Sequence, residues 1–129
     1  MSSGWIMALG VGAGGFVGSI CRYGLGVAFA RLSSTWPLGT FAANVAGCFF
    51  IGAIMALTDR VEISPVWRVA LATGFCGGFT TMSSFVFEGA QMVRSGENVM
   101  AAFYVFGTLA FSVAAFFAGT IVVRWGGGA

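Results

Sequence analysis

Two sets of polar residues recur at helical spacing inside apolar stretches of this sequence. Members of each set stand four residues apart, and residues four apart lie on one face of an α-helix. The two sets are Thr40, Asn44 and Cys48, and Tyr104, Thr108 and Ser112. An amide or hydroxyl that faces hydrocarbon costs free energy unless it finds a hydrogen-bond partner. We therefore expect both polar tracks to face protein or water, where such groups bind ions or bond neighbouring helices.

A third concentration of small and polar residues occupies the run TGFCGGFTTMSSFVFE, residues 73–88, inside another apolar stretch. Gly77 and Gly78 supply backbone freedom, and the hydroxyls that follow can pair with main-chain groups released by unwinding. Non-helical backbone at membrane depth is tolerated only where it is buried in protein or lines a cavity. We predict a helix broken near residues 75–81. Its released carbonyls can hold a cation, and a half-helix N-terminus attracts an anion.

Two ionisable residues, Arg22 and Glu88, stand out within apolar segments. Such residues are costly in a membrane and usually face a cavity. Arg22 either extends its charged end to the membrane surface or draws anions into a vestibule. Glu88 follows the polar run by one turn, and it either lies at an aqueous end or pairs with an arginine. The sequence assigns no chemistry to Glu88.

Enzymatic chemistry has no support in this chain. The sequence contains no histidine, no spacing of a nucleophile with a base, and no phosphate-binding loop in context. Its three cysteines fall in different apolar segments without metal-ligand spacing. We interpret them as small packing residues, and we expect neither an enzyme nor a nucleic-acid-binding protein.

The composition defines the elements that must position these residues. Of 129 residues, 58% are hydrophobic and only 8% are charged, against roughly 25% charged in soluble domains. One membrane crossing takes about 20 helical residues, and the apolar segments number four: about 5–31, 37–58, 65–93 and 98–123. They lack the in-out alternation of barrel strands. We predict an all-α membrane protein, a single domain over residues 1–129 with four transmembrane helices in the lipid bilayer.

The positive charges are balanced between the two membrane faces. Four crossings place three of the six basic residues on each face, whereas topology normally follows an excess on the cytoplasmic side. This balance favours insertion in both orientations and an antiparallel dual-topology homodimer; the alternative is that six charges are too few to decide. Gly10, Gly14 and Gly18, four residues apart, favour close helix packing.

Three motifs together resemble the Fluc (CrcB) family of small fluoride channels. They are GAGGFVGSICRY, PLGTFAANVAGCFFIG and GFCGGFTTMSSF, and their order in a four-helix chain extends the resemblance over essentially the whole sequence. The resemblance implies an antiparallel homodimer with two fluoride pores and a central structural sodium ion. It implies that the main-chain carbonyls of Gly77 and Thr80, from both subunits, hold the sodium.

The resemblance also implies roles for side chains. Arg22 would be the vestibule arginine, and the fluoride pore would be lined by Asn44, Met82, Phe85, Tyr104, Thr108 and Ser112. Met82 departs from the family pattern T-T-F-S-T-F, in which two phenylalanines present electropositive ring edges. Thr108 stands where serine is commoner, and it keeps the hydroxyl.

The implied function is passive export of fluoride across the bacterial cytoplasmic (inner) membrane by a multi-pass protein. Two other readings are a drug or cation antiporter and a non-transporting assembly subunit. Proton coupling in an antiporter would need a carboxylate in the first segment, and the four acidic residues lie elsewhere: Asp59, Glu62, Glu88 and Glu97. In an assembly subunit, the polar tracks would only bond helices together.

Overall fold

The computed structural model describes residues 2–33 and 35–126, and these residues form helices joined by short connections. Its elements are α1 (Ser2–Ala30), α2 (Leu38–Thr58), α3 (Pro65–Val69), η1 (Ala70–Cys76), α4 (Gly77–Phe79), α5 (Met82–Arg94) and α6 (Asn98–Gly126). The predicted domain 1–129 also includes residues 1, 34 and 127–129, which lie outside the described part.

Within the described residues, four helical spans are long and apolar enough to cross a membrane: Gly4–Ala30, Leu38–Thr58, Pro65–Arg94 and Asn98–Gly126. The prediction of an all-helical protein with four crossings is therefore confirmed. The first helix starts a few residues before the predicted boundary at 5, because nothing between Ser2 and Trp5 interrupts helical geometry.

Local signals set the helix ends. Pro65 is the first residue of α3, where its missing amide hydrogen costs nothing, and the Ser64 hydroxyl accepts from the Trp67 amide at 3.5 Å. After α5, Gly96 has a φ of 82°, which glycine adopts without steric cost. The Glu97 amide then donates to the Met92 carbonyl at 2.9 Å, which closes the helix end in a Schellman motif.

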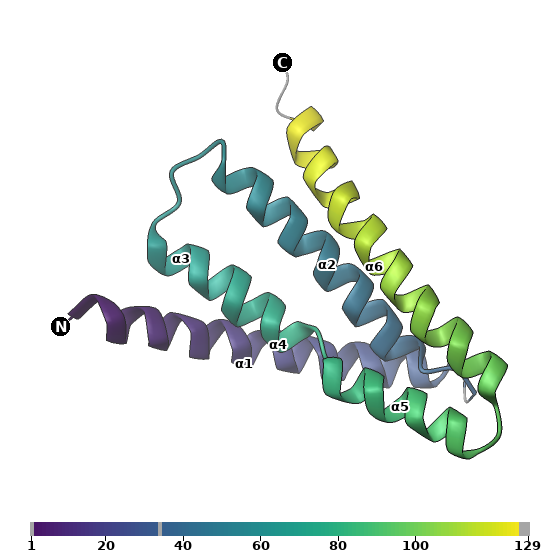
Figure 1. Cartoon of the computed structure of the whole chain (residues 1–129). Coiled ribbons are helices and arrows are strands. Elements are labelled where there is room, and N and C mark those ends of the chain that lie inside the picture. Colours follow the sequence, from purple (N-terminus) through teal and green to yellow (C-terminus); the bar gives the residue numbers. More distant parts are fainter. Residues whose placement is uncertain (1, 34, 127–129) are drawn as a thin grey trace.

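The helices associate in two pairs through contacts between backbones. In Figure 1, α6 runs alongside α2, and the segment from α3 to α4 runs alongside α1. A Cβ atom added at Gly52 would lie 2.1 Å from the Phe116 carbonyl oxygen, and one added at Gly14 would lie 2.1 Å from the Ala70 carbonyl oxygen. Without a hydrophobic force between helices in lipid, small residues let backbones approach this closely.

The third crossing changes conformation along its length. The π-helical η1 leads into α4, and Thr80 (φ −85°, ψ 160°) and Thr81 (φ −149°, ψ 112°) are extended before α5 begins at Met82. Within the predicted break near residues 75–81, the extended residues are Thr80 and Thr81, whereas Gly77 stays helical, with φ −64° and ψ −38°. Gly78 serves packing instead: a Cβ atom there would lie 2.4 Å from the Gly15 carbonyl oxygen of α1.

Candidate functional site

Asn44 of α2 bonds to the main chain of Thr81 at two points. Its Nδ2 donates to the Thr81 carbonyl at 3.1 Å, and its Oδ1 accepts from the Thr81 amide at 2.8 Å. The side-chain amide thus pairs with an extended residue much as a neighbouring strand would. The second Nδ2 hydrogen remains available to another acceptor.

Two carbonyls of the third crossing lose their helical donors. In an α-helix, the carbonyl of one residue accepts from the amide four residues later. The amide that would pair with Gly77, that of Thr81, donates to Asn44. The amide that would pair with Thr80, that of Ser84, donates to the Thr81 Oγ1 at 3.2 Å, as an N-cap bond of α5. The oxygens of Gly77 and Thr80 therefore lack these two intrahelical donors.

Arg22 of α1 reaches the same region from the other side. Its Nε donates to the Gly78 carbonyl at 3.0 Å. The half-buried Arg22 also lines a cavity of about 310 Å³, together with Thr40, Thr81 and Ser84. The arginine, within α1, thus contacts the third crossing at Gly78.

Glu88 of α5 accepts hydrogen bonds from two other helices. The Thr40 hydroxyl of α2 donates to its Oε1 at 2.8 Å, and the Tyr104 hydroxyl of α6 donates to its Oε2 at 2.7 Å. Sequence reasoning left Glu88 without a role. The sequence did contain a signal for this role, because an acidic residue in an apolar segment requires hydrogen-bond partners. Each of the two polar tracks supplies one of them, Thr40 and Tyr104.

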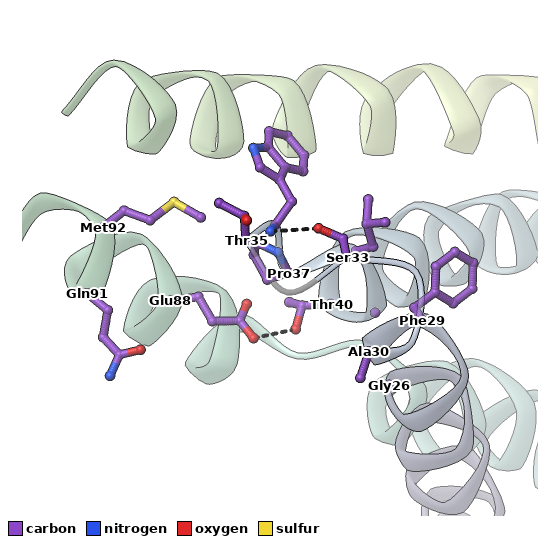
Figure 2. A pocket seen from close by; sticks show the side chains of 13 residues that line it. Gly26, Phe29, Ala30, Ser33, Thr35, Pro37, Thr40, Glu88, Gln91 and Met92 are labelled. Carbon is purple, nitrogen blue, oxygen red and sulfur yellow. Dashed lines mark hydrogen bonds between the residues drawn. The ribbon is translucent and has the colours of Figure 1, made fainter. Parts of the chain in front are cut away.

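A polar cavity of about 320 Å³ opens beside this carboxylate, under the connection between α1 and α2. Figure 2 shows the Glu88 carboxylate directed at the Thr40 hydroxyl, with Ser33 and Gly26 on the other side of the space. Thr40 lines this cavity and also the one beside Arg22. The two cavities therefore approach each other at Thr40.

Phe85 and Met82, which the resemblance places together in the pore lining, lie in different environments in this chain. Phe85 is buried, and its ring centre lies 5.3 Å from that of Tyr104. Tyr104 also contacts the Trp36 ring edge-on at 5.6 Å. Met82, in contrast, is 66% exposed on the surface of the chain. Phe85 thus supports the Tyr104 ring, while Met82 is presented to the surroundings.

The remaining residues of the α6 track differ in what their hydroxyls do. The Thr108 hydroxyl donates to the Tyr104 carbonyl of its own helix at 2.6 Å, and Thr108 is buried. Ser112 is half-buried. In this conformation the Thr108 proton is engaged, so only its oxygen lone pairs remain for another group.

These features define an all-helical, multi-pass membrane protein in which α1, α2 and α6 contribute polar side chains to the third crossing. A family model described as "CrcB-like protein, Camphor Resistance (CrcB)" matches residues 9–120. The chain belongs to this family.

Relatives from several bacteria match nearly the whole chain. A protein of Chlorobium chlorochromatii (strain CaD3) is 43% identical over 116 residues, which cover 89% of this chain and 90% of the relative. One from Chlorobium luteolum is 44% identical, with coverages of 88% and 89%, and one from Acidobacterium capsulatum is 40% identical, with 88% and 93%. All three relatives carry the name fluoride-specific ion channel FluC.

Proposed function

We propose that this protein is a fluoride channel, which lets fluoride leave the cell passively across the bacterial cytoplasmic (inner) membrane. The observation that carries the proposal is the similarity of 40% or more, over nearly the full chain, to proteins named fluoride-specific ion channels. The geometry supports it, because polar groups from several helices gather within an otherwise apolar bundle.

Fluoride holds its water tightly, so the protein must replace that water with hydrogen-bond donors. The second Nδ2 hydrogen of Asn44 and the Ser112 hydroxyl are available donors, and the Tyr104 hydroxyl can turn from Glu88 to a passing anion. Ring edges such as that of Phe85 add weak positive potential. Each site must also be weak enough to release the ion.

We propose that the working unit is an antiparallel dual-topology homodimer with two pores. Gly77, Met82 and Ser83 are exposed in the single chain, and a second copy packed against this surface would cover them. The balance of basic residues between the two faces supports insertion in both directions.

We further propose that a sodium ion lies between the two copies. Unwound backbone carbonyls coordinate sodium in membrane proteins, and the released oxygens of Gly77 and Thr80 fit that chemistry. One chain offers two such oxygens, so a second copy would complete a set of four. When bound, the sodium supplies a fixed positive charge beside the anion path.

A crystal structure of the protein in lipid tests the dimer and the ion together. We expect four main-chain oxygens around a monovalent ion on a two-fold axis, with the two copies inserted in opposite directions. A dimer whose copies point the same way, or carbonyls turned away from the axis, would contradict both proposals.

Fluoride efflux from proteoliposomes tests the function. We expect a fluoride electrode to record rapid release from potassium-fluoride-loaded liposomes once valinomycin balances the charge, without an imposed proton gradient. Chloride-loaded liposomes made from the same protein should release chloride no faster than protein-free liposomes. Release of chloride in place of fluoride, or a requirement for a proton gradient, would overturn the assignment.

The Tyr104 hydroxyl is expected to contribute to transport. Tyr104→Phe keeps the ring contacts with Phe85 and Trp36 but removes the hydroxyl that we propose turns from Glu88 to the passing fluoride. A hydrogen bond to a charged group such as fluoride contributes about 1.5–3 kcal/mol, so fluoride efflux should fall roughly tenfold or more. Thr120→Val is the control, because it removes another buried hydroxyl of α6, one that bonds to the Phe117 carbonyl. Equal rates for the two variants would contradict a role for Tyr104.

A further inference from the structure

The Gly78 carbonyl accepts hydrogen bonds from two side chains of α1. The Nε of Arg22 donates at 3.0 Å, and the hydroxyl of Ser19 donates at 3.5 Å. Ser19 and Arg22 stand three residues apart and so lie on one face of α1. The contact spans 56 residues of sequence, so it joins the first crossing to the third.

This carbonyl lies where the helical run of residues 65–79 ends. In a continuous helix it would accept from the amide of residue 82, but the chain becomes extended at Thr80 and Thr81. Carbonyls at the end of a helix lack intrahelical donors and carry partial negative charge. A guanidinium is a favourable partner there, because it supplies both a donor and a positive charge.

The extended segment is thus held from two sides. Asn44 of α2 bonds to the amide and the carbonyl of Thr81, and Arg22 of α1 bonds to the carbonyl of Gly78. If the helix were continuous, the amide of residue 82 would compete with Arg22 and Ser19 for the lone pairs of the Gly78 carbonyl. Both side chains therefore favour the extended conformation over a continuous helix.

We propose that Arg22 is a positioning residue, which ends the helical run at Phe79 and keeps Thr80 and Thr81 extended. This inference rests on the proposed function, in which the released carbonyls and Asn44 form part of the ion path. It assigns Arg22 a role through the backbone, in addition to any attraction that its charge exerts on anions in the adjoining cavity. Lysine is not equivalent, because the observed bond comes from the guanidinium Nε, whereas lysine carries its donors one bond further out, on a flexible four-carbon stem.

Two substitutions separate positioning from simple charge. Arg22→Lys keeps the charge but loses the guanidinium, whereas Arg22→Met loses both and carries no hydrogen-bond donor. Arg31→Gln is the control, since Arg31 is exposed at the end of α1. The readouts are hydrogen exchange by mass spectrometry for a peptide covering residues 77–84, and fluoride efflux at low and high ionic strength.

We expect both Arg22 variants to accelerate amide exchange in residues 77–84 by about tenfold or more, the effect of losing one charged hydrogen bond. Exchange in α2 and α6 should be unchanged. Efflux should fall to a similar extent in both variants at both ionic strengths, while Arg31→Gln matches the wild type in every readout.

Three results would overturn the inference. The first is a wild-type rate of exchange and efflux in Arg22→Lys, together with a loss in Arg22→Met that high salt abolishes. Charge alone would then explain the role of Arg22. The second is exchange in residues 77–84 unchanged in both variants. The third is acceleration spread equally over α2 and α6, which would indicate general destabilisation. If the wild type released no fluoride, the exchange comparison would still decide the role of Arg22.

Discussion

Fluoride efflux should drop to the leak of protein-free liposomes when Asn44 is replaced by aspartate. The carboxylate can still accept from the Thr81 amide, but it cannot donate to the Thr81 carbonyl, which lies 3.1 Å from the present Nδ2. It also places a negative charge in the proposed anion path. At 4 Å and an effective dielectric constant of 20, such a charge opposes an anion by about 4 kcal/mol, or roughly a thousandfold in rate.

The same substitution at Asn98 is the matched control. Asn98 is exposed at the start of α6, and an acidic residue is favourable at the beginning of a helix. Asn98→Asp should therefore transport fluoride at the wild-type rate, measured with a fluoride electrode on liposomes that contain equal amounts of protein. Wild-type efflux from Asn44→Asp would remove Asn44 from the pathway.

Gly18→Ala is expected to destabilise the folded protein strongly. A Cβ atom there would lie 2.2 Å from the Phe75 carbonyl oxygen and 2.8 Å from the Phe79 amide nitrogen. Both atoms belong to the backbone, so no flexible side chain can move aside. Overpacking typically costs about 1–3 kcal/mol, and we expect at least the upper end of this range as a loss in the free energy of unfolding.

Gly12→Ala makes the same change on the same helix, but there a Cβ atom would meet nothing within 4 Å of the chain. Alanine is favoured over glycine in a helix by up to about 1 kcal/mol, so this variant should be at least as stable as the wild type. Size-exclusion profiles after graded heating compare the two variants. Equal thermal resistance would show that α1 can shift away from the third crossing at little cost.

The sequence was sufficient to predict the crossings and the existence of polar contacts. Hydropathy and length identify a membrane helix because no other regular structure of about 20 apolar residues satisfies its backbone in lipid. The same physics requires partners for Asn44 and Tyr104, and the structure shows them in Thr81 and Glu88.

The identity of those partners could not be predicted, because it depends on how the helices approach one another. The glycines illustrate the difficulty. Gly77 and Gly78 are compatible with an unwound backbone and with close packing, and the sequence alone does not distinguish the two. The close approach of Gly78 to Gly15 of α1 shows that Gly78 serves packing. The backbone angles show that the extended residues are Thr80 and Thr81. The difference in exposure between Met82 and Phe85 likewise depends on where α5 begins.

The unequal lengths of the helices have a consequence for the surrounding lipid. At 1.5 Å per residue, the 21 residues of α2 span about 31 Å, whereas the 29 residues of α1 and of α6 span about 44 Å. Hydrocarbon about 30 Å thick matches α2 upright, while the longer helices must tilt to hide their apolar length. Bilayers of different thickness should therefore change the inclination of α1 and α6. Asn44 bonds Thr81 to α2, the helix whose length matches the hydrocarbon. The depth of Thr81 in the bilayer should therefore stay constant.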